Sequence, residues 1–115
     1  MAICAKLCNS FVWSCAGIKY AFKSDLSFKL EVFLALLLIP LAFWLAHSKV
    51  ELILLIMAVL IVLLTELINT ALETIVDRIS LDDHLLSKHA KDLGSAVVFC
   101  SLVLLVVVWG IICIF

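Results

Sequence analysis

Hydrophobic positions gather in three long segments of this chain, and the middle segment is the most informative. Residues 52–64 form an almost unbroken apolar run, and the segment continues to residue 76 with polar residues at regular intervals. Apolar segments at 28–47 and 91–115 are also long enough to cross a bilayer as helices, which takes about 17–25 residues. Pro40 lies inside the first of them and is expected to kink that helix without ending it. The pattern therefore predicts three membrane-spanning helices, at 28–47, 52–76 and 91–115.

Residues 1–24 have a different pattern, with a narrow polar stripe on an otherwise apolar segment. The stripe is Lys6, Ser10, Ser14 and Gly17, and aromatic side chains lie among the apolar residues around it. Such a helix is expected to lie in the membrane interface, where lysine side chains reach lipid phosphates. The polar residues also interrupt any signal-peptide core. We therefore expect an N-terminal amphipathic surface helix at 1–24.

The composition agrees with a membrane protein. Hydrophobic residues make up 67% of the 115-residue chain, against about 45–50% in a soluble domain. One proline and three glycines leave little loop, so we expect an all-α fold in a single domain, 1–115, with lipid as its main solvent. The five cysteines show no metal-binding spacing and are expected to be small apolar residues in a reducing compartment. No nucleic-acid partner is expected.

Basic residues indicate which way the chain crosses the membrane. Seven of the eight fall on one side of the three-span arrangement: Lys6, Lys19, Lys23, Lys29, Arg78, Lys88 and Lys91. Lys49 alone falls on the other side. Because basic residues are enriched on the cytoplasmic side of membrane proteins, the N-terminus and the polar segment 77–90 are expected to face the cytoplasm. The expected location is a bacterial plasma (inner) membrane, with the C-terminus outside.

Polar residues enter the middle segment at helical spacing. Glu66, Asn69, Glu73 and Asp77 are separated by steps of 3, 4 and 4 residues. On an α-helix these four side chains share one face, over a length of roughly 16 Å. Ionisable groups inside a membrane segment are costly. The stripe therefore indicates a functional site that binds a metal, moves a proton or binds a substrate.

Further charged and polar residues are expected at the same membrane face: Asp25 and Glu31 near the first span, and Lys88, Lys91, Asp92 and Ser95 near the third. Carboxylates from two helices and a lysine suit Mg²⁺ and a polyphosphate, because Mg²⁺ takes oxygen ligands and lysine supplies a point charge to phosphate. Another carboxylate, kept off the metal, can accept a proton from a hydroxyl nucleophile. The three glycines are isolated, which excludes a glycine-rich phosphate loop.

These residues carry a resemblance to a known family. The pattern GluxxAsnxxxGluxxxAsp (Glu66 to Asp77) is followed by HisxxxxxxLysAspxGlySer (His84 to Ser95), and together they resemble the prokaryotic diacylglycerol kinases. GlyIleLys at 17–19, Phe28 and Glu31 also fit the N-terminal segment of that family. These proteins are small integral-membrane lipid kinases, and the resemblance covers almost the whole chain.

The resemblance implies a homotrimer in which each subunit has three spans and a surface helix, with active sites between neighbouring subunits. It implies an ATP- and Mg²⁺-dependent transfer of phosphate to diacylglycerol at the cytoplasmic interface. Glu66 would be the catalytic base, and Asp25 and Glu73 would bind the metal. The nucleotide-binding residues would be Lys6, Trp13, Asp25, Glu73, Asp82, Asp83, His84, Lys91 and Asp92. The lipid-binding residues would be Lys6, Glu31, Glu66 and Ser95, with Asn69 and Asp77 in supporting roles.

The chain departs from the family pattern at three of these positions. Asp25 stands where the family usually has Glu, and its shorter side chain makes direct metal ligation harder. Lys6 stands at a usual Arg, which loses bidentate phosphate recognition. Trp13 stands at a usual Tyr and lacks its hydroxyl. All three changes are expected to affect nucleotide contacts without changing the reaction.

Other interpretations of the same residues stay open at this point. Undecaprenol kinase is the alternative closest in chemistry, and a non-enzymatic proton-relay subunit or a purely structural oligomer are more distant ones. Glu66 alone would serve a relay, or it would be a buried structural acid. Asn69 also suits interhelical hydrogen bonding. Asp77 also suits a helix end, and the segment 82–84 a solvated loop.

Overall fold

The computed structural model describes residues 2–79 and 84–115, and this part of the chain is entirely helical apart from short connections. The helices are α1 (Ala2–Ser24), α2 (Leu26–Leu45), α3 (Lys49–Ile79) and α4 (Leu85–Ile114). By length and composition α2, α3 and α4 are each able to cross a membrane. The prediction of an all-α protein with three apolar spans is therefore confirmed.

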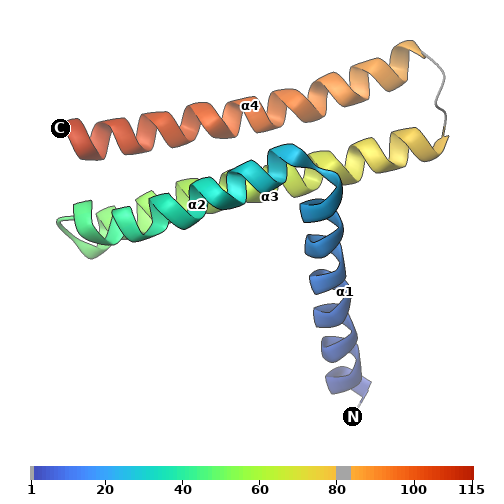
Figure 1. Cartoon of the computed structure of the whole chain (residues 1–115), viewed down its shortest axis with the longest axis horizontal. Helices are drawn as coiled ribbons and strands as arrows, with labels where there is room; N and C mark the ends of the chain where they lie inside the picture. Colours follow the sequence, from blue (N-terminus) through green and yellow to red (C-terminus); the bar gives the residue numbers. More distant parts are fainter. Residues whose placement is uncertain (1, 80–83) are drawn as a thin grey trace.

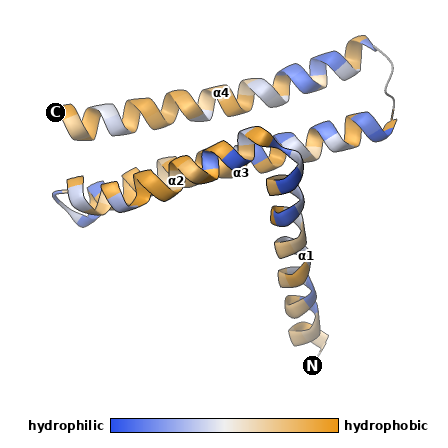
Figure 2. Ribbon diagram, in the orientation of Figure 1, coloured by the Kyte–Doolittle hydropathy of each residue, from blue (hydrophilic) through white to orange (hydrophobic). Residues whose placement is uncertain are grey.

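The three apolar helices run alongside one another in alternating directions, while α1 projects away from them across their length (Figure 1). The middle helix of the sequence, α3, packs against both α2 and α4. The connection from α2 to α3 and the C-terminus lie at one end of the bundle. Figure 2 shows that the polar parts of α3 and α4 lie at the other end, toward the segment that joins these two helices. The topology thus gathers most of the charged residues of the spans at one end, apart from Lys49 and Glu51 at the start of α3.

Helix α2 begins and ends two residues earlier than the predicted span 28–47. Its start is set by Asp25, whose carboxylate accepts a hydrogen bond from the backbone N–H of Ser27 at 2.9 Å and caps the helix. At the other end, α2 stops at Leu45. Pro40 lies within the helix, which continues through it, as expected.

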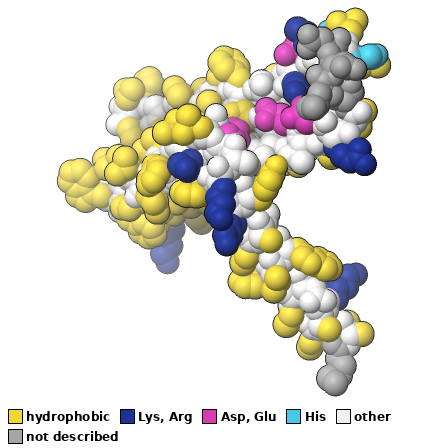
Figure 3. Space-filling view, turned by 45° about the vertical axis from the view of Figure 1, so that its right-hand side comes forward, with side chains coloured by type: hydrophobic (Ala, Val, Ile, Leu, Met, Phe, Trp, Pro, Cys, Tyr) yellow, Lys and Arg dark blue, Asp and Glu magenta, His cyan; other side chains and the backbone are white. Residues whose placement is uncertain are grey.

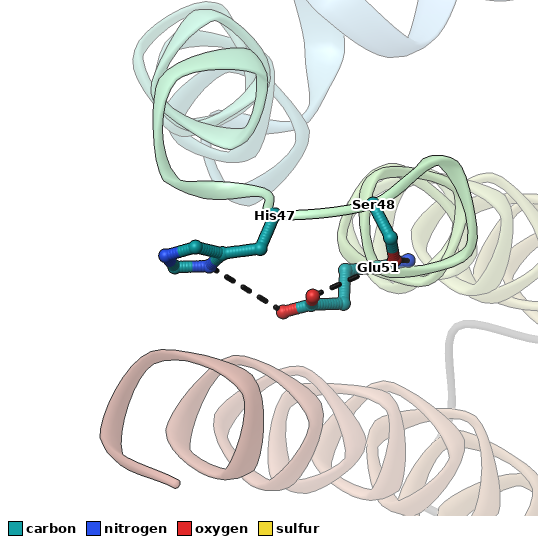
Figure 4. Close-up of polar contacts among 3 residues, drawn as sticks. All are labelled: His47, Ser48 and Glu51. Atoms are coloured by element: carbon teal, nitrogen blue, oxygen red, sulfur yellow. Dashed lines mark hydrogen bonds and ion pairs between the residues drawn. The ribbon is translucent and has the colours of Figure 1, made fainter.

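The turn after α2 is shorter than predicted, and α3 starts at Lys49 instead of residue 52. The hydroxyl of Ser48 accepts a hydrogen bond from the backbone N–H of Glu51 at 3.1 Å and thereby caps the first turn of α3. Nδ1 of His47 lies 3.8 Å from a carboxylate oxygen of Glu51 across this turn (Figure 4). Local capping by polar side chains, which a hydrophobic pattern does not record, accounts for the difference.

Helix α4 begins six residues before the predicted apolar span at 91–115. Nδ1 of His84 accepts a hydrogen bond from the backbone N–H of Leu86 at 3.1 Å, so His84 is the N-terminal cap. The first two turns of α4 are polar, and α3 likewise continues three residues past 76, to Ile79. Both helices therefore extend beyond their apolar segments.

Small residues form much of the buried core between the spans. Ala35, Ala42 and Ala58 are each at most 5% exposed, and they let the helix backbones approach closely. Around them lie Leu55, Val59, Val62 and Leu105. Most of the large apolar side chains point outward, as expected for helices whose surroundings are lipid or further protein.

Candidate functional site

The site begins at the junction between α1 and α2, where the chain turns at Asp25. One carboxylate oxygen of Asp25 caps α2, and the other accepts a hydrogen bond from the hydroxyl of Thr70 on α3 at 2.7 Å. The short side chain suits the capping position, where Asp is strongly preferred. Asp25 therefore has a structural role as the N-terminal cap of α2.

The acidic stripe predicted on the middle span lies on α3 and is buried to different depths along the helix. Glu66 and Asn69 are only 3% and 7% exposed, Glu73 is half-buried and Asp77 is exposed. Nδ2 of Asn69 donates a hydrogen bond to Oε1 of Glu73 at 3.3 Å. The stripe thus runs from the protein interior at Glu66 to the surface at Asp77.

Three carboxyl groups from two segments meet beside the buried end of this stripe. Glu66 interacts with both Asp25 and Glu31. Burial acts to raise the pKa of Asp25, but hydrogen bonds from Thr70, from Glu66 and from backbone N–H groups outweigh it and lower this pKa. Oε2 of Glu31 is buried and has no hydrogen-bond partner among the described residues. Asp25, Glu31 and Glu66 therefore form one cluster of interacting carboxyl groups.

A polar hollow of about 290 Å³ opens beside Asp25. We call it the acidic hollow, and its lining includes the carboxylates of Asp25, Glu73 and Asp77. Acidic side chains gather along one strip of this face, with basic side chains to either side (Figure 3). Within the described residues no group of three or more His, Cys, Asp or Glu side chains is arranged to hold a metal by itself. The donor set instead fits Mg²⁺, which typically takes one or two carboxylates together with substrate phosphates.

Lysines lie at the outer part of the site. Nζ of Lys91 on α4 lies 2.7 Å from a carboxylate oxygen of Asp77 on α3. Nζ of Lys88 forms a second ion pair with Asp92 at 2.7 Å, within α4 and well exposed. Lys91 therefore reaches the rim of the acidic hollow, whereas Asp92 points along its own helix to Lys88.

Several residues implied by the resemblance lie away from this hollow in the single chain. Lys6 and Trp13 are exposed on α1, the helix that projects from the bundle (Figure 1). His84 caps α4, and Ser95 is exposed on that helix. Asp82 and Asp83 lie outside the described residues. One chain thus brings together the carboxylates and Lys91, but not the more distant nucleotide contacts.

An apolar groove of about 580 Å³ lies between α1 and α3. Gly17, Ile18 and Ala21 line it from α1, and Leu67, Ala71 and Ile75 line it from α3. It shares Tyr20, Thr70 and Thr74 with the acidic hollow, so the two spaces adjoin. Apolar and acidic surfaces are therefore continuous at the point where α1 meets α3.

The sequence interpretation missed Thr70, which contacts Asp25 directly. Its spacing would have revealed it, because Glu66, Thr70, Glu73 and Asp77 are separated by steps of 4, 3 and 4 and share one helix face. A threonine in an apolar helix usually bonds its hydroxyl to a carbonyl of its own helix. Its contact with another segment depends on the tertiary structure.

Comparisons with known proteins agree with this geometry. The family model for prokaryotic diacylglycerol kinase matches residues 12–113. The diacylglycerol kinase of Haemophilus influenzae is 51% identical over 104 residues, covering 90% of this chain and 88% of the relative. That of Pseudomonas aeruginosa is 43% identical over 105 residues (91% and 85%), and that of Escherichia coli K12 is 36% identical over 99 residues (86% and 81%). The chain belongs to the prokaryotic diacylglycerol kinase family.

Proposed function

We propose that this protein transfers the γ-phosphoryl group of ATP to the free primary hydroxyl of diacylglycerol, giving phosphatidate and ADP. The observation that carries the proposal is the meeting of Asp25, Glu66 and Glu73 from two segments at the polar end of the bundle, next to Lys91. A structural oligomer or a proton relay requires at most one intramembrane acid. Membership in the diacylglycerol kinase family supports the same substrate.

In the reaction, the lipid hydroxyl oxygen forms a bond to the γ-phosphorus while the bond from that phosphorus to the bridging oxygen of ADP breaks. Glu66 accepts the hydroxyl proton as general base, which requires it to lie within hydrogen-bond reach of the lipid. Glu31 is a proposed lipid contact, and its Oε2 has no hydrogen-bond partner among the described residues. The adjoining apolar groove provides space for an acyl chain entering sideways from the bilayer.

Asp25 and Glu73 would hold Mg²⁺ bound to the nucleotide phosphates, with Asn69 orienting Glu73 and Asp77 orienting Lys91. The ion, when bound, offsets the negative charge of the phosphates. Lys91 adds positive charge at the rim of the hollow. The remaining proposed nucleotide contacts are Lys6, Trp13, Asp82, Asp83, His84 and Asp92, and Ser95 is a proposed lipid contact.

The family resemblance implies a homotrimer with shared sites, and the small size of the acidic hollow supports a site completed by a neighbouring subunit. Ligand sites typically enclose about 300–1,000 Å³, and this hollow of about 290 Å³ is too small for ATP beside a lipid. A neighbouring subunit would cover the open side of the hollow and bring a second α1, with its Lys6 and Trp13, to the site. We place α1 on the membrane surface and the hollow on the cytoplasmic side, because seven of eight basic residues lie at that end.

The test is transfer of label from [γ-³²P]ATP to diacylglycerol or undecaprenol, with and without Mg²⁺, by the protein in detergent micelles. We expect Mg²⁺-dependent labelling of diacylglycerol. Preference for the polyprenol would overturn the substrate, and a folded but inactive protein would favour a proton relay. Glu66→Gln should abolish turnover while leaving assembly and ATP affinity nearly intact, and Glu73→Gln should raise the Mg²⁺ requirement. Glu51→Gln, at the opposite end of the same helix, is the matched control.

A further inference from the structure

We infer that Thr70 is a positioning residue, whose hydroxyl holds the carboxylate of Asp25 where it can act on the metal together with Glu73. This inference rests on the proposed function, because it takes Asp25 and Glu73 as the metal-binding pair. Thr70 is 9% exposed and lines both the acidic hollow and the apolar groove. It lies one helical turn after Glu66 and just under one turn before Glu73.

The hydroxyl of Thr70 has one proton and two acceptors within reach. The carboxylate of Asp25 lies at 2.7 Å, and the backbone carbonyl of Glu66 lies at 3.0 Å. Hydrogen bonds to an ionised acceptor are shorter and stronger than those to a neutral one. We therefore infer that the Thr70 hydroxyl donates mainly to the Asp25 carboxylate, with the Glu66 carbonyl as a second, weaker acceptor.

This hydrogen bond connects two segments whose relative position the proposed metal site requires. Asp25 lies at the α1–α2 junction, whereas Glu66 and Glu73 lie on α3. The capping bond to Ser27 fixes Asp25 relative to α2, and the Thr70 bond fixes it relative to α3. Without the Thr70 hydroxyl, Asp25 would remain a helix cap and keep its interaction with Glu66, but it would be held less firmly relative to Glu73. The metal site would then be assembled less completely, while the proton acceptor Glu66 would be unchanged.

Thr70→Val removes the hydroxyl and keeps the shape of the side chain, and Thr70→Ser keeps the hydroxyl. Thr65→Val is the matched control on the same helix. Its hydroxyl bonds the carbonyl of Val62 and lies 2.9 Å from that of Ser101 on α4, away from the acidic hollow. Equal thermal unfolding of the variants in detergent would establish that each is folded.

Two measurements test the inference. The first is the Mg²⁺ concentration for half-maximal turnover, which we expect Thr70→Val to raise about tenfold, or about 1.4 kcal/mol, with kcat at saturating Mg²⁺ within about twofold of wild type. The second is independent of turnover: binding of Mn²⁺ with a non-hydrolysable ATP analogue, followed by electron paramagnetic resonance, should weaken by a similar factor. Thr70→Ser should recover both values to within about threefold, and Thr65→Val should leave both near wild type.

The outcomes separate this inference from the proposed function. Unchanged Mg²⁺ and Mn²⁺ affinity in Thr70→Val, with an active wild type, would overturn the positioning role alone. So would a loss of kcat in Thr70→Val at unchanged metal affinity, or a failure of Thr70→Ser to rescue. A wild-type protein that transfers no label to diacylglycerol would overturn the proposed function first.

Discussion

Gly94 lies where α4 approaches the acidic face of α3, and adding a methyl group there tests that packing. A Cβ at Gly94 would overlap Oδ1 of Asn69 and lie 3.3 Å from its Cγ and 3.5 Å from Cδ1 of Leu72. Oδ1 of Asn69 is buried and accepts no hydrogen bond among the described residues. In Gly94→Ala the Asn69 side chain must therefore move, and its 3.3 Å hydrogen bond to Glu73 is expected to break.

Two opposing effects decide the magnitude. Alanine is favoured over glycine inside a helix by about 1 kcal/mol, whereas overpacking a well-packed site costs about 1–3 kcal/mol. The free energy of unfolding of Gly94→Ala should thus lie between the wild-type value and about 2 kcal/mol below it. Gly110→Ala on the same helix is the control, because a Cβ there meets nothing within 4 Å. This control should gain about 1 kcal/mol of stability.

The assay compares unfolding of the two variants in one detergent by circular dichroism, together with phosphorylation turnover. We expect Gly94→Ala to be about 1–3 kcal/mol less stable than Gly110→Ala, which is the overpacking cost alone. Loss of the hydrogen bond to Glu73 should also reduce turnover about tenfold, since a bond to a charged group contributes about 1.5–3 kcal/mol. Equal stability and equal turnover in the two variants would refute the packing argument.

Two further predictions concern the ends of the bundle. Asp25→Ala should lose about 1 kcal/mol of stability with the helix cap, and Asp25→Asn should keep the cap, because Asn caps a helix about as well as Asp, while losing the stabilisation that the charge provides; both should need more Mg²⁺. The pKa of Asp25 is lower in the folded protein than its usual value. At a pH above the usual value, the Asp25 carboxylate should therefore stabilise the fold, and this stabilisation should be lost as the pH falls through the lowered pKa. Thermal unfolding against pH should show this loss in wild type but not in Asp25→Asn. Trp109→Phe removes a 3.1 Å hydrogen bond to the Leu55 carbonyl, far from the site. It should cost about 0.6–1.7 kcal/mol in unfolding assays without changing the Mg²⁺ requirement.

The apolar segments were sufficient to predict an all-α protein with three spans, because a helix that crosses a bilayer must be apolar over most of its length. The same pattern marks the apolar spans and not the helix ends, which differ from the span bounds by up to six residues. Asp25, Ser48 and His84 cap the helices through local hydrogen bonds. Polar turns at the ends of α3 and α4 carry no hydrophobic signal, although they continue the helices.

The sequence by itself also determined that Glu66, Asn69, Glu73 and Asp77 share a helix face, since that depends only on the pitch of the α-helix. Only the tertiary structure decided what meets this face. The turn at Asp25 brings the first segment to Thr70, and Gly94 lets α4 lie directly against Asn69. These contacts join residues distant in the chain, so they depend on how the helices pack and not on spacing within any one of them.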